Sequence, residues 1–505
     1  MTHPDFDKLI NQAKKMQLLA SVEALLSWDQ ETYMPKEAIV LRTDQLSLIA
    51  SLVHKMQTCK DWSDSLSQFI NLDTGEFKTS NLSNEEKVCL KEWLKDYQKT
   101  IKLPSSFVEA MAKATSETTH VWIQARKEND FNKFAPYLEN VINLTKEKAN
   151  FLGYENHPYD ALLDHYEPKM TTKKLDKIFA SLKKDLVDLL SKIQKSPQID
   201  NKFLITEYDH AEQIKFGHMI LEFMTFKPTS SRLDESVHPF TMGLHPDDVR
   251  LTTRVVPTLI MSNISSVLHE GGHGLYEAGL PAKYFGTPLG QSVSLGVHES
   301  QSRFWETMIG KSMPFWTFFY PLLQKSFTNQ FSHIPLPKFY SAINRVEPSL
   351  IRIESDEVTY CLHIILRYEL EKGLIEGSFQ VKDLPKLWNK KMEELLGIIP
   401  DSDSNGCMQD VHWPSGLIGY FPTYALGNIY AGQLFDTFKK SHSDWEKKVS
   451  KGALEFIRLW LKEHIHQYGR IFSPAELIEK TTNKPISSKD YITYLTEKYQ
   501  KIYGL

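Results

Sequence analysis

The sequence predicts one large, mainly α-helical domain over residues 1–505, and three observations indicate this. Apolar residues recur at helical spacing through most of the chain. No repeat period and no low-complexity linker divides the chain into smaller units. Only residues 233–258 change to a pattern that favours β structure, so we expect one small β element within a helical protein.

Composition and charge narrow the class of protein. With 41% hydrophobic and 24% charged residues, the chain has the make-up of an ordinary globular protein. Its net charge of −4 predicts no nucleic-acid partner, and it has no stretch of about 18 apolar residues that would span a membrane. The four cysteines are scattered and the N-terminus lacks an apolar targeting segment, so we expect reduced thiols in a cytoplasmic protein.

Helical periodicity dominates the N-terminal part. Residues 4–25 and 36–56 predict helices, and the aromatic and polar turn 28–35 between them indicates a packed helix–helix junction. Residues 59–84 are polar and interrupted, which predicts a mobile connection. Long helices follow from 84 to 150, with lysine and glutamate on one side and large apolar residues on the other.

The middle of the chain changes from helices to a β element. Thr171 caps a predicted helix at 173–195, and residues 207–226 predict another. The run 249–256 then favours a hairpin or small sheet. A peptide substrate could add a strand to such a sheet. A hairpin at the edge of the core, without any substrate contact, explains the pattern equally well.

The stretch 259–279 contains a match to H-E-x-x-H. On a helix His269 and His273 lie four residues apart, so both imidazoles project from one face and can hold one metal ion. Glu270 lies about 100° round the same turn, where it can act as a base without being a ligand. The alternative is a core helix whose histidines are held by neighbouring hydrogen bonds.

Three glycines inside this predicted helix favour the metal site over the plain core helix. Gly271, Gly272 and Gly274 each cost about 1 kcal/mol relative to alanine in a helix. We therefore expect another element or a ligand to approach this turn closely.

A second predicted helix, at 292–310, carries a candidate third ligand. Glu299 is an acidic residue of the kind that completes a site with two histidines. A salt bridge from Glu299 to Arg303 at i+4 is the alternative. His298 is rotated by one position from Glu299, so we do not expect both side chains to bind the same ion.

Two further segments carry polar residues of interest. Residues 336–372 predict a long helix in which Arg352 either forms a weak surface pair with Asp356 or acts as a bidentate trap for a carboxylate. The glycine-rich loop 406–424 displays His412 and Tyr420, and such loops often hold proton donors and oxyanion partners.

Three further predictions follow from the residues. His238 stands before a proline at a turn and is a third candidate donor. Cys407 is predicted to serve in buried packing. Residues 443–505 are predicted to be helical and to carry no chemistry.

Together these segments resemble the carboxypeptidase Taq family of metallocarboxypeptidases. Its signature motifs are matched in order by HPF, DVRLT, HEGGH, HESQ, IRIESD and GCMQDVHW, at residues 238–240, 248–252, 269–273, 298–301, 351–356 and 406–413. WDQETYMP at 28–35 and YDALLDHYEP at 159–168 are similar to its N-terminal half. Ser355 departs from the family pattern, which usually has alanine there.

The resemblance implies a zincin fold similar to neurolysin and angiotensin-converting enzyme, with a deep groove over the metal. Residues 1–150 would cover the groove and residues 230–440 would form the catalytic core. The enzyme would be a homodimer that releases single C-terminal residues from peptides with broad specificity. The ligands of one Zn²⁺ per subunit, which Co²⁺ can replace, would be His269, His273 and Glu299.

The same assignment predicts how the residues divide the chemistry. Glu270 takes a proton from the attacking water and passes it to the leaving amine. A donor among His238, His412 and Tyr420 stabilises the oxyanion, and Arg352 binds the free carboxylate of the peptide. A zinc-dependent oligo-endopeptidase with the same site is the alternative enzyme. A metal-free helical scaffold that binds peptides is the alternative from another class.

Overall fold

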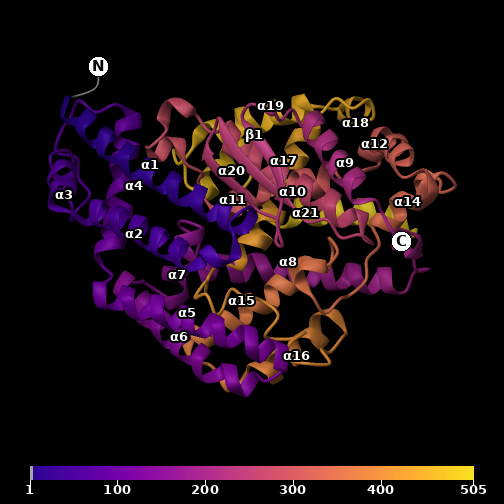
Figure 1. The fold of residues 1–505 in the computed structure, drawn as a ribbon, viewed down its shortest axis with the longest axis horizontal. Helices are drawn as coiled ribbons and strands as arrows, with labels where there is room; N and C mark the ends of the chain where they lie inside the picture. Colours follow the sequence, from indigo (N-terminus) through magenta and orange to yellow (C-terminus); the bar gives the residue numbers. More distant parts are fainter. Residues whose placement is uncertain (1–3) are drawn as a thin grey trace.

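The computed structural model describes residues 4–505, which form a mainly helical protein with one small sheet (Figure 1). The helices before the sheet are α1 (Pro4–Thr32), α2 (Ile39–Thr58), α3 (Lys60–Ser67), α4 (Asn84–Ile101), α5 (Ser105–Glu128), α6 (Phe131–Leu152), α7 (Pro158–Tyr166), α8 (Thr172–Gln194) and α9 (His210–Phe223). In Figure 1 the first four helices, in indigo, lie together on the left, and the C-terminus lies on the right.

The sheet divides these helices from a second set. The helices after the sheet are α10 (Ile260–Gly279), α11 (Leu295–Arg303), α12 (Met313–Ser326), α13 (Thr328–Phe331), α14 (Leu336–Ile343), α15 (Tyr360–Glu376), α16 (Leu384–Leu396), α17 (Pro422–Ser441), α18 (Trp445–Val449), α19 (Glu455–His464), α20 (Pro474–Thr482) and α21 (Lys489–Tyr503). A π-helical segment, Phe304–Ile309, directly continues α11. No helix within residues 4–505 has the length and hydropathy needed to cross a bilayer.

Several helices are capped at their N-terminus. A side chain there accepts a hydrogen bond from a backbone N–H of the first turn, which has no partner within the helix. The predicted cap Thr171 is confirmed, because its side chain accepts a hydrogen bond from the backbone of Lys174. Ser83 and Glu86 form a reciprocal capping box at the start of α4. Ser294 caps α11 by accepting from Val297.

The junction after α1 is packed, as predicted, and it also contacts the sheet. The guanidinium groups of Arg232 and Arg250 lie 4.8 and 4.5 Å from the Trp28 ring centroid. Tyr33 donates a 2.5 Å hydrogen bond to the carboxylate of Asp234. These contacts hold the end of α1 against two strands.

The prediction of a mobile connection at 59–84 is wrong. Helix α3 and an antiparallel bridge between Ile70 and Phe77 order this segment. Its buried side chains, including Trp62 and Leu66, pack with Phe6 of α1 in a small hydrophobic core. The polar residues that suggested mobility lie between these buried apolar residues. That the apolar residues share one core is visible only from the tertiary contacts.

The predicted small sheet is confirmed and has three strands, β1 (Ser231–Glu235), β2 (Thr241–His245) and β3 (Asp248–Thr253). The strand order is β1-β3-β2, in which β3 runs parallel to β1 and antiparallel to β2. Val249 and Leu251 of β3 are fully buried in the main core. Strand β2 therefore forms one edge of the sheet.

The main hydrophobic core takes side chains from Trp122 to Tyr503 and encloses α10. Ile260, Ile264 and Val267 of α10 are all fully buried, which confirms the predicted burial of this helix on most sides. Cys407 is also buried, as predicted. In Figure 1 α10, α11 and α17 lie near the centre of the molecule.

The long helical region predicted at 336–372 contains two helices, and the placing of Arg352 within a helix beside Asp356 is wrong. Helix α14 ends at Ile343, a 3₁₀ turn covers Arg352–Glu354, and α15 begins only at Tyr360. Pro348 lies in the break, where a proline has no N–H for a helical hydrogen bond. The Asp356 carboxylate accepts hydrogen bonds from the backbone of Val358 and Thr359, and the predicted pair with Arg352 does not form.

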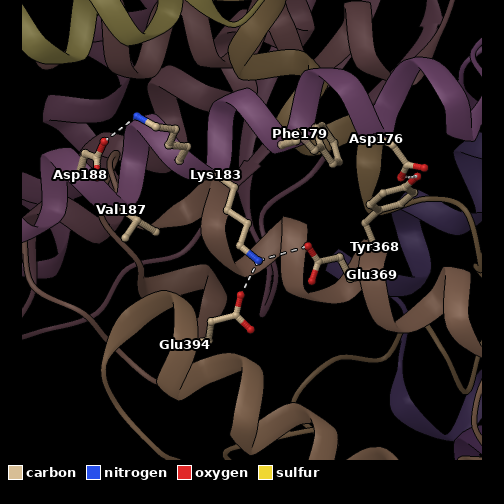
Figure 2. A pocket seen from close by; sticks show the side chains of 10 residues that line it. Asp176, Phe179, Lys183, Val187, Asp188, Tyr368, Glu369 and Glu394 are labelled. Atoms are coloured by element: carbon tan, nitrogen blue, oxygen red, sulfur yellow. Dashed lines mark hydrogen bonds and ion pairs between the residues drawn. The ribbon is translucent and has the colours of Figure 1, made fainter.

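A hollow of about 500 Å³ opens on the surface between α8, α15 and α16 (Figure 2). Lys183 lies in its centre, 2.6 Å from a carboxylate oxygen of Glu394 and 3.5 Å from one of Glu369. None of the predicted site residues lines this hollow. Its other charged side chains are also in ion pairs, Lys184 with Asp188 and, from outside the lining, Lys372 with Asp176 and Lys391 with Glu369. The candidate site lies elsewhere.

Candidate metal centre

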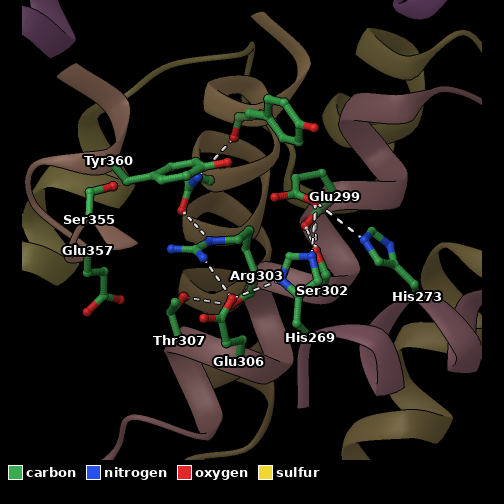
Figure 3. Close-up of polar contacts among 12 residues, drawn as sticks. His269, His273, Glu299, Ser302, Arg303, Glu306, Thr307, Ser355, Glu357 and Tyr360 are labelled. Atoms are coloured by element: carbon green, nitrogen blue, oxygen red, sulfur yellow. Dashed lines mark hydrogen bonds and ion pairs between the residues drawn. The ribbon is translucent and has the colours of Figure 1, made fainter. Parts of the chain in front are cut away.

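Helices α10 and α11 bring the three predicted ligands together. The Nε2 atoms of His269 and His273 lie 3.7 and 3.4 Å from the same Glu299 oxygen, Oε2 (Figure 3). All three residues have donor atoms within 4.8 Å of one another. Two imidazole nitrogens and a carboxylate oxygen form a donor set typical of catalytic zinc, so the residues present fit a divalent metal ion.

Close packing of neighbouring elements explains the glycines of α10. A Cβ on Gly272 would lie 2.4 Å from the backbone oxygen of Gln301 in α11, so only glycine lets the two helices approach this closely. At Gly274 it would lie 3.0 Å from the Phe226 ring. On α17, a Cβ on Gly427 would lie 2.4 Å from Cγ of Glu299. The prediction that another element packs against this turn is confirmed.

A chain of contacts behind His269 holds its ring. Its Nδ1 lies 2.9 Å from Oε2 of Glu306, and Arg303 donates to the same oxygen at 2.7 Å (Figure 3). Arg303 also donates to Asn428 of α17 at 2.9 Å. Such partners fix the orientation of a ligating histidine. Glu306 lies in the π-helical segment, so helical spacing in the sequence did not point to it.

His273 is held by a different pair. Its Nδ1 lies 2.6 Å from Nδ1 of His298, whose Nε2 lies 2.7 Å from the Glu277 carboxylate. His298 therefore supports His273 from outside the three-residue cluster. That His298 does not share the ion stays a prediction. Glu299 receives its own support from Ser302, whose hydroxyl donates to Oε2 at 3.0 Å.

The pKa values of the two histidines are shifted in opposite directions. Burial alone would lower the pKa of His269, but Glu299 and Glu306 outweigh it and raise that pKa to about 9. Burial and the adjacent His298 lower the pKa of His273 to about 4. Burial opposes ionisation of Glu299, yet the two histidines hold its pKa below the usual range. A buried cluster rich in carboxylates is an environment that favours a bound cation.

Glu270 lies beside the cluster and is only 6% exposed. The hydroxyl of Thr241 in β2 is a hydrogen-bond donor that lies 2.7 Å from Oε2 of Glu270 and 2.9 Å from the backbone oxygen of Glu270. Burial raises the pKa of Glu270. A carboxylate with a raised pKa, held in one orientation, is suited to accept and return a proton. Sequence reasoning missed Thr241, because nothing local connects the strand to the helix.

The loop before α17 forms a second cluster, which contains His412 and Tyr420. Their rings lie 5.4 Å apart, and Nε2 of His412 lies 3.2 Å from the hydroxyl of Tyr424. Burial, followed by the charge of Arg352, lowers the pKa of His412 to about 3, so its imidazole is neutral near pH 7. Burial and then the Glu299 carboxylate raise the pKa of Tyr420.

Arg352 is buried and shares a carboxylate with a second arginine. Its Nε and Nη2 lie 3.0 and 2.9 Å from Oδ1 of Asp410, while Arg367 donates to Oδ2 at 2.7 Å. The two guanidinium groups hold the pKa of Asp410 far below its usual range, although burial opposes this. Two cations facing one carboxylate leave a net positive charge. The Tyr360 hydroxyl receives a 3.3 Å hydrogen bond from Arg352, and the Arg303 guanidinium lies 5.1 Å from the Tyr360 ring centroid.

His238 lies in the connection between β1 and β2, and its side chain is exposed. Its backbone oxygen accepts a hydrogen bond from the Ser236 hydroxyl. Among the described residues, no hydrogen bond, ion pair or ring contact joins its side chain to the ligands. Its predicted role stays a prediction.

A hollow of about 540 Å³ lies next to the metal cluster, between the N-terminal helices and the edge of the sheet. Its lining includes Lys99 of α4, Tyr166 of α7, Gly243 of β2 and Glu277 of α10. Glu277 is the carboxylate that contacts His298, the partner of His273, but none of the three predicted ligands lines the hollow.

Comparison with known proteins gives consistent matches along the chain. The model of the carboxypeptidase Taq (M32) metallopeptidase family matches residues 8–499. Thermostable carboxypeptidase 1 of Thermus thermophilus is 38% identical and aligns over 99% of this chain and 99% of its own length. Carboxypeptidase 1 of Bacillus subtilis is 36% identical over 97% of each chain.

Solved structures agree with this result. The M32 carboxypeptidase of Deinococcus radiodurans has a TM-score of 0.96 at 33% identity, with 100% of both chains covered. A Pyrococcus furiosus carboxypeptidase has a TM-score of 0.95 at 35% identity, with 99% of each chain covered. The mainly helical fold is that of M32 carboxypeptidases, and the family is one of metal-dependent carboxypeptidases. With its sequence, its fold and its His/His/Glu cluster in agreement, the chain belongs to the carboxypeptidase Taq (M32) family of metallopeptidases.

Proposed function

We propose that this protein is a zinc carboxypeptidase that releases single C-terminal residues from peptides with broad specificity. One observation carries the proposal: Tyr360 links the buried Arg352 to the contacts that support the His269, His273 and Glu299 cluster. Arg352 donates a hydrogen bond to the Tyr360 hydroxyl, and Arg303, whose partner Glu306 holds His269, lies over the Tyr360 ring. A candidate metal centre and a buried cationic group are thus connected through one tyrosine.

In this proposal the three ligands hold one zinc ion per subunit, and cobalt can replace it. When bound, the ion supplies Lewis acidity and an acidic water with a pKa of about 7. Glu270, oriented by Thr241, accepts the water proton and delivers it to the leaving amine. Tyr420 and the neutral imidazole of His412 are the candidate donors to the oxyanion, with His238 as a third.

Arg352 is the candidate that selects chain ends. Because Arg352 and Arg367 share only Asp410, one positive charge is uncompensated and can attract the free carboxylate of a peptide. An endopeptidase has no need of such a charge. The hollow beside β2 would then receive the rest of the peptide, in a groove of the neurolysin type that residues 1–150 cover.

Digestion of one decapeptide tests the proposal. With a free C-terminus, we expect a ladder of products shortened one residue at a time, read by mass spectrometry. The same peptide with an amidated C-terminus is the control and should be cut far more slowly. Interior fragments from both peptides would instead identify an oligo-endopeptidase. Elemental analysis should give one zinc per chain, and a chelator should remove both zinc and activity. Absence of both zinc and activity would favour the peptide-binding scaffold, and activity that survives removal of the metal would indicate another chemistry.

A homodimer is proposed from the apolar surface of the first two helices. Leu18 and Val22 of α1 are 55% and 44% exposed, and Leu41, Leu48 and Leu52 of α2 are 61%, 61% and 41% exposed. On each helix the spacing places these residues on one stripe. Exposed apolar surfaces of this kind are typical of protein interfaces. Leu48→Glu should yield monomers in light scattering, whereas Ile123→Glu, a similarly exposed position on α5, should not.

The cytoplasm is the proposed compartment. Within the described residues the four cysteines are unpaired, and three of them are buried. Unpaired thiols are usual in a reducing compartment.

A further inference from the structure

The segment around α7 contains YDALLDHYEP, which contributes no residue to the ligand cluster. At each end of this segment lies a fully buried carboxylate outside the ligand cluster. Glu167 directly follows α7, and Glu371 of α15 contacts Tyr159 in the first turn of α7. Both carboxylates are 0% exposed. A buried carboxylate is costly unless several donors surround it, so the donors show what each one organises.

Glu167 organises the start of the ligand helix α11. Its Oε2 accepts a 3.0 Å hydrogen bond from the backbone N–H of Gly296, and its Oε1 accepts a 2.9 Å bond from Tyr430 of α17. A Cβ on Gly296 would lie 2.5 Å from Oε2, so the backbone of α11 lies directly against this carboxylate. A negative charge at the start of a helix is also favoured by the helix dipole.

This contact lies less than one turn from a ligand. Glu299 follows Gly296 by three positions, and its side chain lies against Gly427 of α17, the helix that also carries Tyr430. Glu167 therefore joins α7, α11 and α17 at the place where the position of the Glu299 carboxylate is determined.

Glu371 organises the loop of His412 and Tyr420 in the same way. It accepts hydrogen bonds from the Tyr159 hydroxyl at 2.6 Å, the Trp413 ring nitrogen at 2.8 Å and the Gly419 backbone at 3.1 Å. Trp413 directly follows His412, and Gly419 directly precedes Tyr420. The one carboxylate thus holds both ends of the loop between the two candidate donors.

The body of α7 closes against the same loop. A Cβ on Gly419 would lie 3.1 Å from the backbone carbon of Leu162, and Gly419 has a φ of +94°, which disfavours other residues there. The Tyr166 ring meets the Tyr420 ring edge-on at 5.2 Å. Helix α7 is therefore in contact with both halves of the site without contributing a ligand.

We propose that Glu167 and Glu371 are two separate positioning residues tied together by α7, Glu167 for the ligand Glu299 and Glu371 for the loop that carries His412 and Tyr420. Glu167 acts on metal retention and Glu371 acts on turnover. The second assignment rests on the proposed function, since it takes His412 and Tyr420 as transition-state donors. The first requires only that the cluster binds a metal.

The two residues are matched controls for each other, because both are fully buried carboxylates with several donors. In Glu167→Gln and Glu371→Gln the shape is kept and one acceptor oxygen becomes a donor. The zinc-loaded proteins are titrated with a graded chelator, and retained zinc is measured. We expect Glu167→Gln to weaken zinc retention by roughly 10- to 100-fold, as for other groups that support a metal ligand. Glu371→Gln should stay within about twofold of the parent.

Turnover at full zinc occupancy, confirmed by elemental analysis, gives the second readout. We expect Glu371→Gln to lower kcat by roughly tenfold or more, with a much smaller change in KM. A fluorine label on tryptophan, assigned with Trp413→Phe, should show a shifted Trp413 resonance in Glu371→Gln and an unshifted one in Glu167→Gln.

Equal loss of zinc retention in both variants, or none in Glu167→Gln, overturns the assignment of Glu167. An unchanged kcat in Glu371→Gln overturns the assignment of Glu371.

If the glutamine variants do not fold, Tyr430→Phe and Tyr159→Phe decide, because each removes one hydrogen bond and keeps the carboxylate. They should weaken zinc retention and lower kcat, respectively, by about two- to fivefold, and the reverse pattern overturns the proposal. Interior cleavage by the parent enzyme would contradict the proposed function and leave the zinc result standing.

Discussion

Glu270 is the candidate general base, and Thr241 of the edge strand β2 donates a hydrogen bond to its carboxylate. Glu270→Gln keeps this shape but cannot accept a proton. We expect kcat to fall by roughly 100- to 10,000-fold, the range for loss of a general base. Zinc content should match the parent, because Glu270 is not among the ligands. Substantial turnover by a zinc-loaded Glu270→Gln enzyme would rule out the base assignment.

Arg352 makes a prediction about substrate choice. Arg352→Ala removes one of two cations from Asp410, and Arg367 still pairs with that carboxylate. For peptides with a free C-terminus we expect KM to rise by roughly 10- to 100-fold, as for a lost charged hydrogen bond. Amidated peptides should be affected much less, and Arg352→Lys should recover part of the loss because it keeps the charge without the fork. Equal changes for both peptides would remove Arg352 from this role.

At the scale of elements, the crossing of α10 and α11 depends on Gly272. Gly272→Ala would place a methyl group 2.4 Å from a backbone oxygen of α11, and backbone cannot rotate away as a side chain can. We expect a loss of about 1–3 kcal/mol in stability, typical of overpacking, together with reduced zinc content because the ligands sit on both helices.

Gly271→Ala is the matched control for this change. Its added methyl would meet the flexible end of Met224 at 2.7 Å, and alanine is the better helix former by about 1 kcal/mol. We expect a smaller fall in the melting temperature and unchanged zinc content. If Gly271→Ala proves the more damaging of the two, the crossing is not set by backbone contact.

At the scale of the whole molecule, buried neutral histidines link stability to pH. Burial, followed by the charges of Arg367 and Arg352, lowers the pKa of the fully buried His363 to about 3. Its pKa in the unfolded chain is about 6.5, so below that pH the unfolded state binds the extra proton. Stability is therefore lost as pH falls from about 6.5 towards 3, by about 2 kcal/mol at pH 5 from this one residue.

His363→Leu removes that contribution. Between pH 7 and about pH 5 we expect the melting temperature of the variant to fall less than that of the parent. Other buried groups, such as Glu371, titrate in both proteins and cancel in the comparison. The same fall in both proteins would show that His363 does not exchange a proton on unfolding.

The fold and the site could be predicted from the sequence where the information is local. His269, Glu270 and His273 lie within about one turn of a helix, and helical spacing alone places their side chains close together. Glu299 was predicted as a third ligand because such a site requires one, and the structure brings it together with both histidines. The helical class, the small sheet and the cap at Thr171 were predicted for the same reason, since each depends on residues adjacent in the chain.

Predictions were wrong mainly where local structure depends on contacts between residues that are distant in the sequence. The segment 59–84 is ordered because its apolar residues meet α1 and α4. The break between α14 and α15 is different, because its cause, Pro348, is local and was overlooked within the helical pattern. Predictions for the domain extent, for His238 and for the likeness to neurolysin remain untested.

The sequence by itself determined which side chains can bind a metal and move a proton, because their spacing on one helix is a local property. Only the tertiary structure decided what holds those side chains in place. Glu306, the pair His298 and Glu277, and the buried Glu167 reach the ligands from segments far away in the chain. Such partners are selected by packing and by the need to satisfy buried charge, and neither has a signature at fixed sequence spacing.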